Sequence, residues 1–534
     1  MGYRSRHRCC GWTPFGEVGA SAPPLAVGVE TRIFAPLTHE RAVSLDGKQH
    51  TSGGRTDALL EKVRATAVPI SRHEQIELAV RLSLPAILAQ LSSILMEYID
   101  SSMVGRLGAQ GSAAIGLIAT TTWLFWGLCA AITTGFSVQV AHHIGGRDAR
   151  GARSVLRQSL LVCLAIGLAM GAVAAAVSRP LPHWLGGREE ICADASRYFL
   201  VFALTLPLCM CNKLMSGMLR CSGNIKAPSL INTGMCALDV LFNFLLIFPT
   251  RTLSCAGIDI LIPGAGLGVL GAALGTACSE VVAACLLGRA LFIRSPHMRL
   301  LGRRSEARGW HSWLPQRAVC VRAVHIGAPI ALERAVMCGA YICTTVIVAP
   351  LGVFAIAANA LGVVAESLCY LPGYGISEAA TTLVGQSVGA GRRDLAQAFA
   401  RITVVMGVSV MAVMGVLLYV AAPLMMGIMT PVPEIIDLGT QALRIEAFAE
   451  PCFALSIVSY GVFVGAGDTL IPSCLNWGTM WVVRISLSLL LAPLMGLNGV
   501  WLAMCIELCV RGLLYLWRLC SGRWIPKKLR TTTQ

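Results

Sequence analysis

The sequence predicts an all-α polytopic membrane protein with twelve transmembrane helices in two pseudo-symmetric six-helix bundles. Three observations support this fold class: only 13% of the 534 residues are charged, apolar runs of about 20 residues recur along the chain, and the two halves repeat. Soluble proteins have about 25% charged residues, and about 20 apolar residues suffice for a helix to cross a bilayer. A transmembrane β-barrel is excluded because the runs are continuously apolar and do not alternate.

The basic residues indicate how the predicted spans are oriented. We expect spans near 82–104, 113–140, 155–177, 198–219, 229–248, 268–292, 324–349, 354–388, 402–425, 443–464, 471–495 and 499–517. The net charge of +15 is concentrated in alternate loops and at both ends of the chain. Loops rich in Lys and Arg stay on the cytoplasmic side, so both termini are expected to be cytoplasmic. Because topology explains these charges, we expect no nucleic-acid partner.

Composition divides the chain into five parts. Residues 1–75 are polar, lack a long apolar run and are expected to form a disordered N-terminal tail. An N-terminal six-helix lobe (76–292) follows, and then a basic cytoplasmic linker (293–323). A C-terminal six-helix lobe (324–520) precedes a basic C-terminal tail (521–534).

The two predicted lobes are copies of one another. A shift of 244 residues places Pro85 on Pro329, and the same shift holds without a gap from about residue 85 to 232. The shift then falls to about 228, because the first half has an extra stretch at 251–267 that we expect to be an outer loop. Six helices per copy give both copies the same orientation, related by an axis along the membrane normal. Such parallel repeats build transporters whose two lobes rock against each other.

Five ordered motifs resemble those of the multidrug and toxic compound extrusion (MATE) family, bacterial-type branch. They are YIDSSMVGRLG (98–108), VAHHIGG (140–146), LRCSGNIKAP (219–228), TLVGQSVGAG (382–391) and GVFVGAGDTLIP (461–472). The resemblance covers residues 75–520. It implies two six-helix bundles around a central cavity, and antiport of amphipathic, often cationic small molecules against H⁺ or Na⁺. A bacterial inner membrane is favoured, partly from this resemblance, whereas the unusual N-terminal tail leaves a eukaryotic organelle open. We expect a monomer.

Two other functions compete with this interpretation. A lipid-linked oligosaccharide flippase of the same wider superfamily would need a basic cavity for a pyrophosphate, whereas the intramembrane charges of the first lobe are mainly acidic. A channel or a non-transporting scaffold would leave the repeat and the buried acids unexplained. The sequence has no hydrolase, kinase or ATP-binding motif, so we expect no enzyme and an ion gradient as the energy source. The 21 Cys residues lack metal-ligand spacing, and we expect no metal site and no cofactor besides the coupling ion.

Two acids in the first span, Glu97 and Asp100, are the first candidates for ion coupling. A charge at the bilayer centre costs at least ~2.5 kcal/mol, so each acid must face protein or water, be protonated or hold a cation. Three residues apart on a helix, they share nearly one face and should titrate as a pair. The resemblance implies that Asp100 couples cations. Alternatively, Asp100 is a structural partner of Lys213 or Arg220, and Glu97 lies in water at the mouth of the cavity.

Asp239 and Asn243 supply further oxygen ligands in the fifth span. Their i, i+4 spacing places both on one helix face. Many members of the family have Asn first and Asp four residues later, and here the order is exchanged. With Asp100 they could form an H⁺ or Na⁺ site in the N-terminal lobe. The alternative for Asn243 is an ordinary interhelical hydrogen bond.

Acids and aromatic residues of the second lobe are candidates for the substrate cavity, where charge and cation–π contact would attract organic cations. These candidates are Glu333, Glu366, Tyr370 and Glu378. The alternative for the acids of this lobe is a set of internal ion pairs, which we expect for Glu446, Arg484 and Glu507.

Two prolines inside predicted helices are candidate hinges. Pro85 and Pro329 each remove a backbone hydrogen bond and permit a kink. Pro85 lies fifteen residues before Asp100, and we expect it to let the first span bend when that acid is protonated.

Overall fold

The computed structural model describes residues 54–65, 68–255, 258–300, 313–527 and 529, so most of the predicted N-terminal tail lies outside the described residues. The first half contains α1 (Arg55–Arg64), α2 (Arg72–Gly105), α3 (Ala109–Gly145), α4 (Ala149–Val177), α5 (Leu181–Trp184), α6 (Glu189–Cys221), α7 (Lys226–Ile247) and α8 (Val269–Arg289). The second half contains α9 (Arg317–Val348), α10 (Val353–Gly389), α11 (Arg393–Met429), α12 (Pro433–Ala447), α13 (Glu450–Ala466), α14 (Leu470–Thr479), α15 (Ser486–Met495) and α16 (Leu497–Ser521).

The prediction of an all-α polytopic fold is confirmed. Among the described residues, eleven helices are long and apolar enough to span a membrane, and the bent pair α12–α13 makes a twelfth span. The bend of 59° lies between Ala447 and Glu450. Pro451 explains it, because proline has no N–H to donate to the carbonyl of Ala447, so the series of helical hydrogen bonds is interrupted at the bend. The sequence had predicted one continuous span across this bend.

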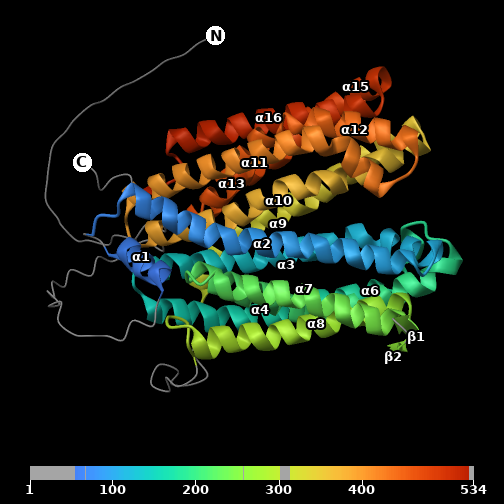
Figure 1. The fold of residues 1–534 in the computed structure, drawn as a ribbon. Helices are drawn as coiled ribbons and strands as arrows, with labels where there is room; N and C mark the ends of the chain where they lie inside the picture. The colour runs from blue at the N-terminus through green and yellow to red at the C-terminus, as the bar shows by residue number, and fades with distance from the viewer. Residues whose placement is uncertain (1–53, 66–67, 256–257, 301–312, 528, 530–534) are drawn as a thin grey trace, which may run out of the picture. The chain divides into compact units, whose positions relative to one another are not determined.

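The helices group into the two expected lobes (Figure 1). In the N-terminal lobe α6 packs against α3, α4 and α8, while α7 packs against α2 and α8. In the C-terminal lobe α13 packs against α10, α11 and α16, and the short helices α14 and α15 are joined by a π-helical turn (Met480–Ile485). The lobes meet where α2 and α3 contact α10 and where α3 contacts α9.

Two corrections concern segments predicted to be irregular. Part of the predicted tail is ordered, because Leu59, Leu60 and Val63 give α1 an apolar face that is buried. Ser71 then starts α2 through a capping box with Glu74, each side chain bonding the other's backbone N–H. The extra stretch after α7 forms an antiparallel hairpin of β1 (Pro249–Cys255) and β2 (Ile258–Ala265). Figure 1 shows this hairpin and α1 at opposite ends of the helices.

Glycines allow the two lobes to approach closely at the end where α1 lies. A Cβ on Gly145 of α3 would lie 2.1 Å from the carbonyl oxygen of Gln386, and a Cβ on Gly389 of α10 would lie 2.1 Å from that of His142. These two contacts are related by the 244-residue repeat. We call the end formed by α1 and the α3–α4, α6–α7, α8–α9 and α10–α11 connections the basic end. The lobes are therefore in backbone contact at the basic end.

Candidate functional site

Asp100, Asp239 and Asn243, which the sequence predicted to form one site, lie together between α2 and α7. The amide nitrogen Nδ2 of Asn243 donates to Asp100 Oδ1 over 2.9 Å and to Asp239 Oδ2 over 3.1 Å. Their spacing along α7 puts Asp239 and Asn243 one turn apart on the face that meets α2. The exchanged order of Asp and Asn therefore still brings both side chains to Asp100.

The site is enclosed from a third side by α8. Ser279 of α8 donates its hydroxyl to Asp239 Oδ1 over 3.1 Å. Asp239 is fully buried and Asn243 is 1% exposed, whereas Asp100 is half-buried. The carboxyl groups of Asp100 and Asp239 also interact directly. We call Asp100, Asp239, Asn243 and Ser279 the carboxylate site.

Gly275 explains how α8 can approach the carboxylate site so closely. A Cβ at this position would lie 2.0 Å from Oδ1 of Asn243, so any larger residue would displace that amide. In the part of the chain that the structure describes, this Oδ1 is buried and makes no hydrogen bond. The sequence analysis missed both Gly275 and Ser279, because neither carries a charge and both lie more than 30 residues from Asp239.

The arrangement suits the uptake and release of one cation. Two neighbouring carboxylates repel each other strongly when both are charged away from water, and a shared proton removes that repulsion. Neither basic residue considered as a structural partner reaches Asp100. Lys213 lies over the ring of Trp126, 4.5 Å from its centroid, and Arg220 forms an ion pair with Glu378.

Glu97 does not join the carboxylate site. Its side chain is exposed, and it makes no hydrogen bond or ion pair with any described residue. Both alternatives that the sequence left open for this acid, a further ion ligand and an acid in water at the mouth of the cavity, stay predictions.

Glu333 is buried inside the C-terminal lobe, and its predicted role in lining a cavity is wrong. It is 3% exposed and accepts hydrogen bonds from Tyr460 (2.7 Å), Ser473 (2.7 Å) and Asn476 (2.5 Å). These partners come from α13 and α14, on the far side of α9 from solvent. Three donors satisfy the carboxylate, which identifies Glu333 as the start of an internal polar network.

The network continues as an ion pair. Arg511 of α16 donates to Asn476 Oδ1 over 2.5 Å and lies 3.2 Å from Glu507, which also accepts from Thr479 over 2.7 Å. An internal ion pair was predicted for Glu507, and the structure shows it with Arg511. Arg484 instead donates to the sulfur of Met504 over 2.6 Å.

Three more carboxylates of the C-terminal lobe are buried near this network. Glu366, predicted to line the cavity, is only 6% exposed and faces the positive charges of Arg484 and Arg511. That prediction is wrong, because Glu366 is enclosed within the C-terminal lobe, on a helix that packs against α11, α12 and α13. Glu446 and Glu450 are fully buried, and neither makes a hydrogen bond to any described residue.

Tyr370 and Glu378, the other two predicted cavity residues, differ in their surroundings. Tyr370 is half-buried against Tyr374 and Phe453, with ring centroids 5.8 Å and 5.5 Å away. Glu378 pairs with Arg220 of α6 and accepts from Gln90 of α2 over 3.2 Å. Glu378 therefore joins the two lobes, and its place in the substrate cavity stays a prediction.

The predicted hinge prolines lie within continuous helices. Pro85 falls inside α2 and Pro329 inside α9. Each occupies the same place in its lobe, as the repeat predicts, and hinge motion at either one stays a prediction.

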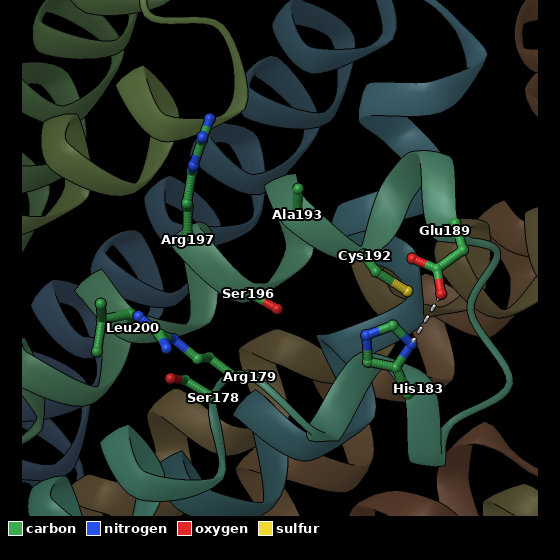
Figure 2. A pocket seen from close by; sticks show the side chains of 9 residues that line it. All are labelled: Ser178, Arg179, His183, Glu189, Cys192, Ala193, Ser196, Arg197 and Leu200. Carbon is green, nitrogen blue, oxygen red and sulfur yellow. Dashed lines mark ion pairs between the residues drawn. The ribbon is translucent and has the colours of Figure 1, made fainter.

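One described cavity lies away from all these residues. It has a volume of about 430 Å³ between the end of α4, α5 and the start of α6, at the end opposite the basic end (Figure 2). Its lining is formed by Ser178, Arg179, His183, Glu189, Cys192, Ala193, Ser196, Arg197 and Leu200. A second cavity of about 280 Å³ lies beside the carboxylate site, where Tyr98, Ser102 and Arg106 of α2 face Phe244 and Phe248 of α7.

Comparison with known proteins supports the repeat and the fold. The MatE family model matches residues 85–245 and again 329–490. The two matches begin 329 − 85 = 244 residues apart, which is the shift found in the sequence. A crystal structure of MATE in complex with MaL6 shares 20% identity and a TM-score of 0.77, covering 87% of this chain and 99% of that one. A structure described as an outward-facing conformation of a multidrug resistance MATE family transporter gives the same TM-score at 20% identity, over 87% and 98%.

Curated relatives match over nearly their full length. The probable multidrug resistance protein NorM of Thermotoga maritima is 25% identical, over 87% of this chain and 95% of that protein. The protein of the same name from Chromobacterium violaceum is 24% identical, over 81% and 91%. Two matches to the family model together cover more than half of the chain. The chain therefore belongs to the MatE family of multi-pass membrane transporters.

Proposed function

We propose that the protein is a monomeric antiporter that exports amphipathic, cationic small molecules across a bacterial inner membrane in exchange for protons. Relatives named as probable multidrug resistance proteins support the direction and breadth of export. The carboxylate site supports ion coupling, and it is the observation on which the proposal depends.

The geometry of the site favours a proton over Na⁺ as the coupling ion. Na⁺ is held by several oxygen ligands at once, but the amide nitrogen of Asn243 faces both carboxylates. A donor in that place leaves less room for a metal ion between the acids. A proton needs only the close approach of Asp100 and Asp239, and it removes the charge that disfavours their burial.

The packing of the lobes supports transport by alternating access. Their backbones meet at the basic end, and the positive-inside rule makes this the cytoplasmic side. The conformation described here is then closed toward the cytoplasm. Export requires the opposite conformation as well, in which α3 and α10 separate at Gly145 and Gly389 and admit the substrate.

The test is ethidium efflux from cells that express the native chain or Asp100→Asn, with proton and sodium gradients imposed separately. We expect efflux by the native chain under a proton gradient alone, and none above background in Asp100→Asn. Asp100→Glu keeps a titratable group and should retain part of the activity. Equal efflux by Asp100→Asn would remove the carboxylate site from the mechanism, and efflux driven only by sodium would reassign the coupling ion.

A further inference from the structure

The helix α1 precedes the first transmembrane span and contacts both lobes at the basic end. We propose that α1 is a latch that holds the lobes together at this end, and that Arg64 is the residue through which it acts. The inference builds on the proposed transport function only in requiring that the two lobes separate at the basic end.

The apolar face of α1 is buried where the two lobes meet. Leu59, Leu60 and Val63 are each at most 4% exposed and belong to one cluster with Leu78 of α2 and Leu383 of α10. The helix α1 lies against α2 and α3 of the N-terminal lobe and against α10 of the C-terminal lobe. Burial of three apolar side chains stabilises this position of α1.

A second contact with the C-terminal lobe supplies hydrogen-bond donors to the backbone carbonyls at the end of α1. Arg392, in the α10–α11 connection, donates through Nη1 to the carbonyl oxygens of Lys62 (3.3 Å), Ala65 (3.1 Å) and Val68 (2.8 Å). The last carbonyls of a helix have no partner within it, so a guanidinium placed there is a favourable cap. Arg392 therefore fixes the end of α1 to the C-terminal lobe.

Arg64 connects α1 to the N-terminal lobe. Its side chain is 5% exposed, and Nη2 donates to the carbonyl oxygen of Ser222 over 3.0 Å. Nη1 lies 2.8 Å from Nε2 of His297 and 2.9 Å from Glu61. Nε donates to Gln386 of α10 over 3.2 Å, and that amide in turn donates to the carbonyl oxygen of Cys221 over 2.9 Å. One planar guanidinium thus links both lobes, as Arg can and Lys cannot.

Opening of the basic end must break the bonds on one side of Arg64. Separation of the lobes moves the α6–α7 connection, which carries Ser222, away from Gln386 on α10. The apolar contacts of α1 with the C-terminal lobe can persist during this movement. The bonds from Arg64 to Ser222 and His297 cannot persist, and neither can the bond from Gln386 to Cys221. Arg64 therefore stabilises the closed state relative to the open one.

His297 makes the latch sensitive to acid. A neutral imidazole accepts from Arg64, whereas a protonated one would place a second positive charge 2.8 Å from it. Burial, and then the charge of Arg64, lower the pKa of His297 from its ordinary value of 6.5. Glu61 and Asp57 of α1 oppose this shift, and Arg153 of α4 adds to it. The latch is therefore complete when His297 is neutral and is weakened as the pH falls through the lowered pKa.

The experiment measures maleimide labelling of single native cysteines in the purified full chain, resolved by peptide mass spectrometry. Cys221 is 4% exposed and adjoins Ser222, so it reports opening at the basic end. Arg64→Ala should speed its labelling about tenfold, the factor expected for losing one charged hydrogen bond. Arg81→Ala is the matched control, because Arg81 lies near the same end of the molecule but pairs with Glu77 of its own helix, α2. It should leave the rate unchanged.

Two reference cysteines separate opening from unfolding. Cys163 is fully buried within the N-terminal lobe and should stay unlabelled, while the exposed Cys520 should label at one rate in every variant. Equal labelling of Cys221 in the native chain and Arg64→Ala would overturn the proposal. If Cys163 is labelled in Arg64→Ala, that variant is unfolded, and Arg64→Lys becomes the test. Lysine keeps the positive charge but lacks the planar guanidinium that donates to several acceptors at once. An unchanged Cys221 rate in Arg64→Lys would also overturn it.

Acidification tests the same latch without a destabilising variant. The ratio of Cys221 to Cys520 labelling in the native chain should rise as the pH falls below 6.5, because the pKa of His297 is lowered from that ordinary value. His297→Gln keeps an acceptor but cannot be protonated, so its ratio should not change. A constant ratio in the native chain would remove His297 from the latch. Labelling needs no ion gradient, so these outcomes are independent of whether the protein couples export to protons.

Discussion

The two lobes share one backbone plan but differ in their buried polar groups. The family model matches both, and the interlobe glycine contacts obey the same 244-residue shift. The carboxylate site nevertheless exists only in the N-terminal lobe. At the position equivalent to Asp100 the C-terminal lobe has Thr344, and residues 480–490, which match the segment that carries Asp239 and Asn243, contain no acid.

The difference separates what the fold needs from what coupling needs. Both lobes need apolar helix faces and small residues at close contacts. The N-terminal lobe adds two interacting carboxylates with no cationic side chain paired to them. The C-terminal lobe instead pairs Glu507 with Arg511 and surrounds Glu333 with donors. Buried acids that lack a protein cation can take one from solution, whereas paired acids have less need of one.

The largest contrast is expected between Asp239→Asn and Thr344→Val. Asp239→Asn removes one of the two acids, so a proton is no longer shared and coupled efflux should fall to background. Thr344 only donates to Ala340 within its own helix, and Thr344→Val should retain full efflux. Ethidium efflux under a proton gradient measures both variants. Comparable loss in the two would show that the lobes contribute equally to coupling.

Breaking the ion pair in the C-terminal lobe should affect stability before transport. Arg511→Met leaves Glu507 buried without its cation, and removing one partner of a buried pair costs about 3 kcal/mol or more. We expect a lower thermal unfolding midpoint in detergent. The double variant Arg511→Met with Glu507→Met should be less destabilised than Arg511→Met alone. Additive losses would show that the two side chains do not act as a pair.

Much of the fold was predictable from the sequence because membrane spans obey simple physical rules. Apolar runs, basic loops and one repeat shift identified the two lobes. The bend before Pro451 was missed, since a proline inside a span also fits a continuous helix, as Pro85 shows in α2. The order of α1 was missed because its three buried apolar residues are too few to stand out in a polar segment. These three residues predict an ordered helix only when the surface of the other helices that covers them is known.

The candidate site was predictable only in part, for a reason that differs between the lobes. An acid in a lipid-spanning segment is conspicuous, so Asp100 and Asp239 were found. Ser279 and Gly275 were not, because polar and small residues are common in such helices. In the second lobe, Glu333, Glu366 and Glu378 were conspicuous too, but their partners lie on other helices. Spacing within one helix cannot show whether an acid faces a cavity or an arginine.

Gly275→Ala should sharpen the contrast between the lobes at a position without charge. The new Cβ would meet Oδ1 of Asn243 at 2.0 Å, so the amide must move from between Asp100 and Asp239. We expect efflux to fall about tenfold, since displacement of an aligned group by 1 Å commonly has at least this effect. Gly288→Ala on the same helix is the control, because its Cβ would meet Phe292 at 3.6 Å and Met215 at 3.9 Å, which are ordinary contact distances. In the C-terminal lobe the position equivalent to Gly275 is already Ala503. Unchanged efflux in Gly275→Ala would mean that the placement of Asn243 is not critical.

The smallest effect is expected for Glu97→Gln, although Glu97 lies one turn from Asp100 on the same helix. An exposed carboxylate is solvated in either protonation state, so it contributes little to the energy of proton uptake at a buried pair. Efflux should change by less than about twofold at neutral pH, as for other weakly coupled surface charges. The measurement is the dependence of efflux rate on external pH, compared with the native chain. A displaced pH profile would show that Glu97 is electrostatically coupled to the carboxylate site, and the coupling group would then contain three acids, all in the N-terminal lobe.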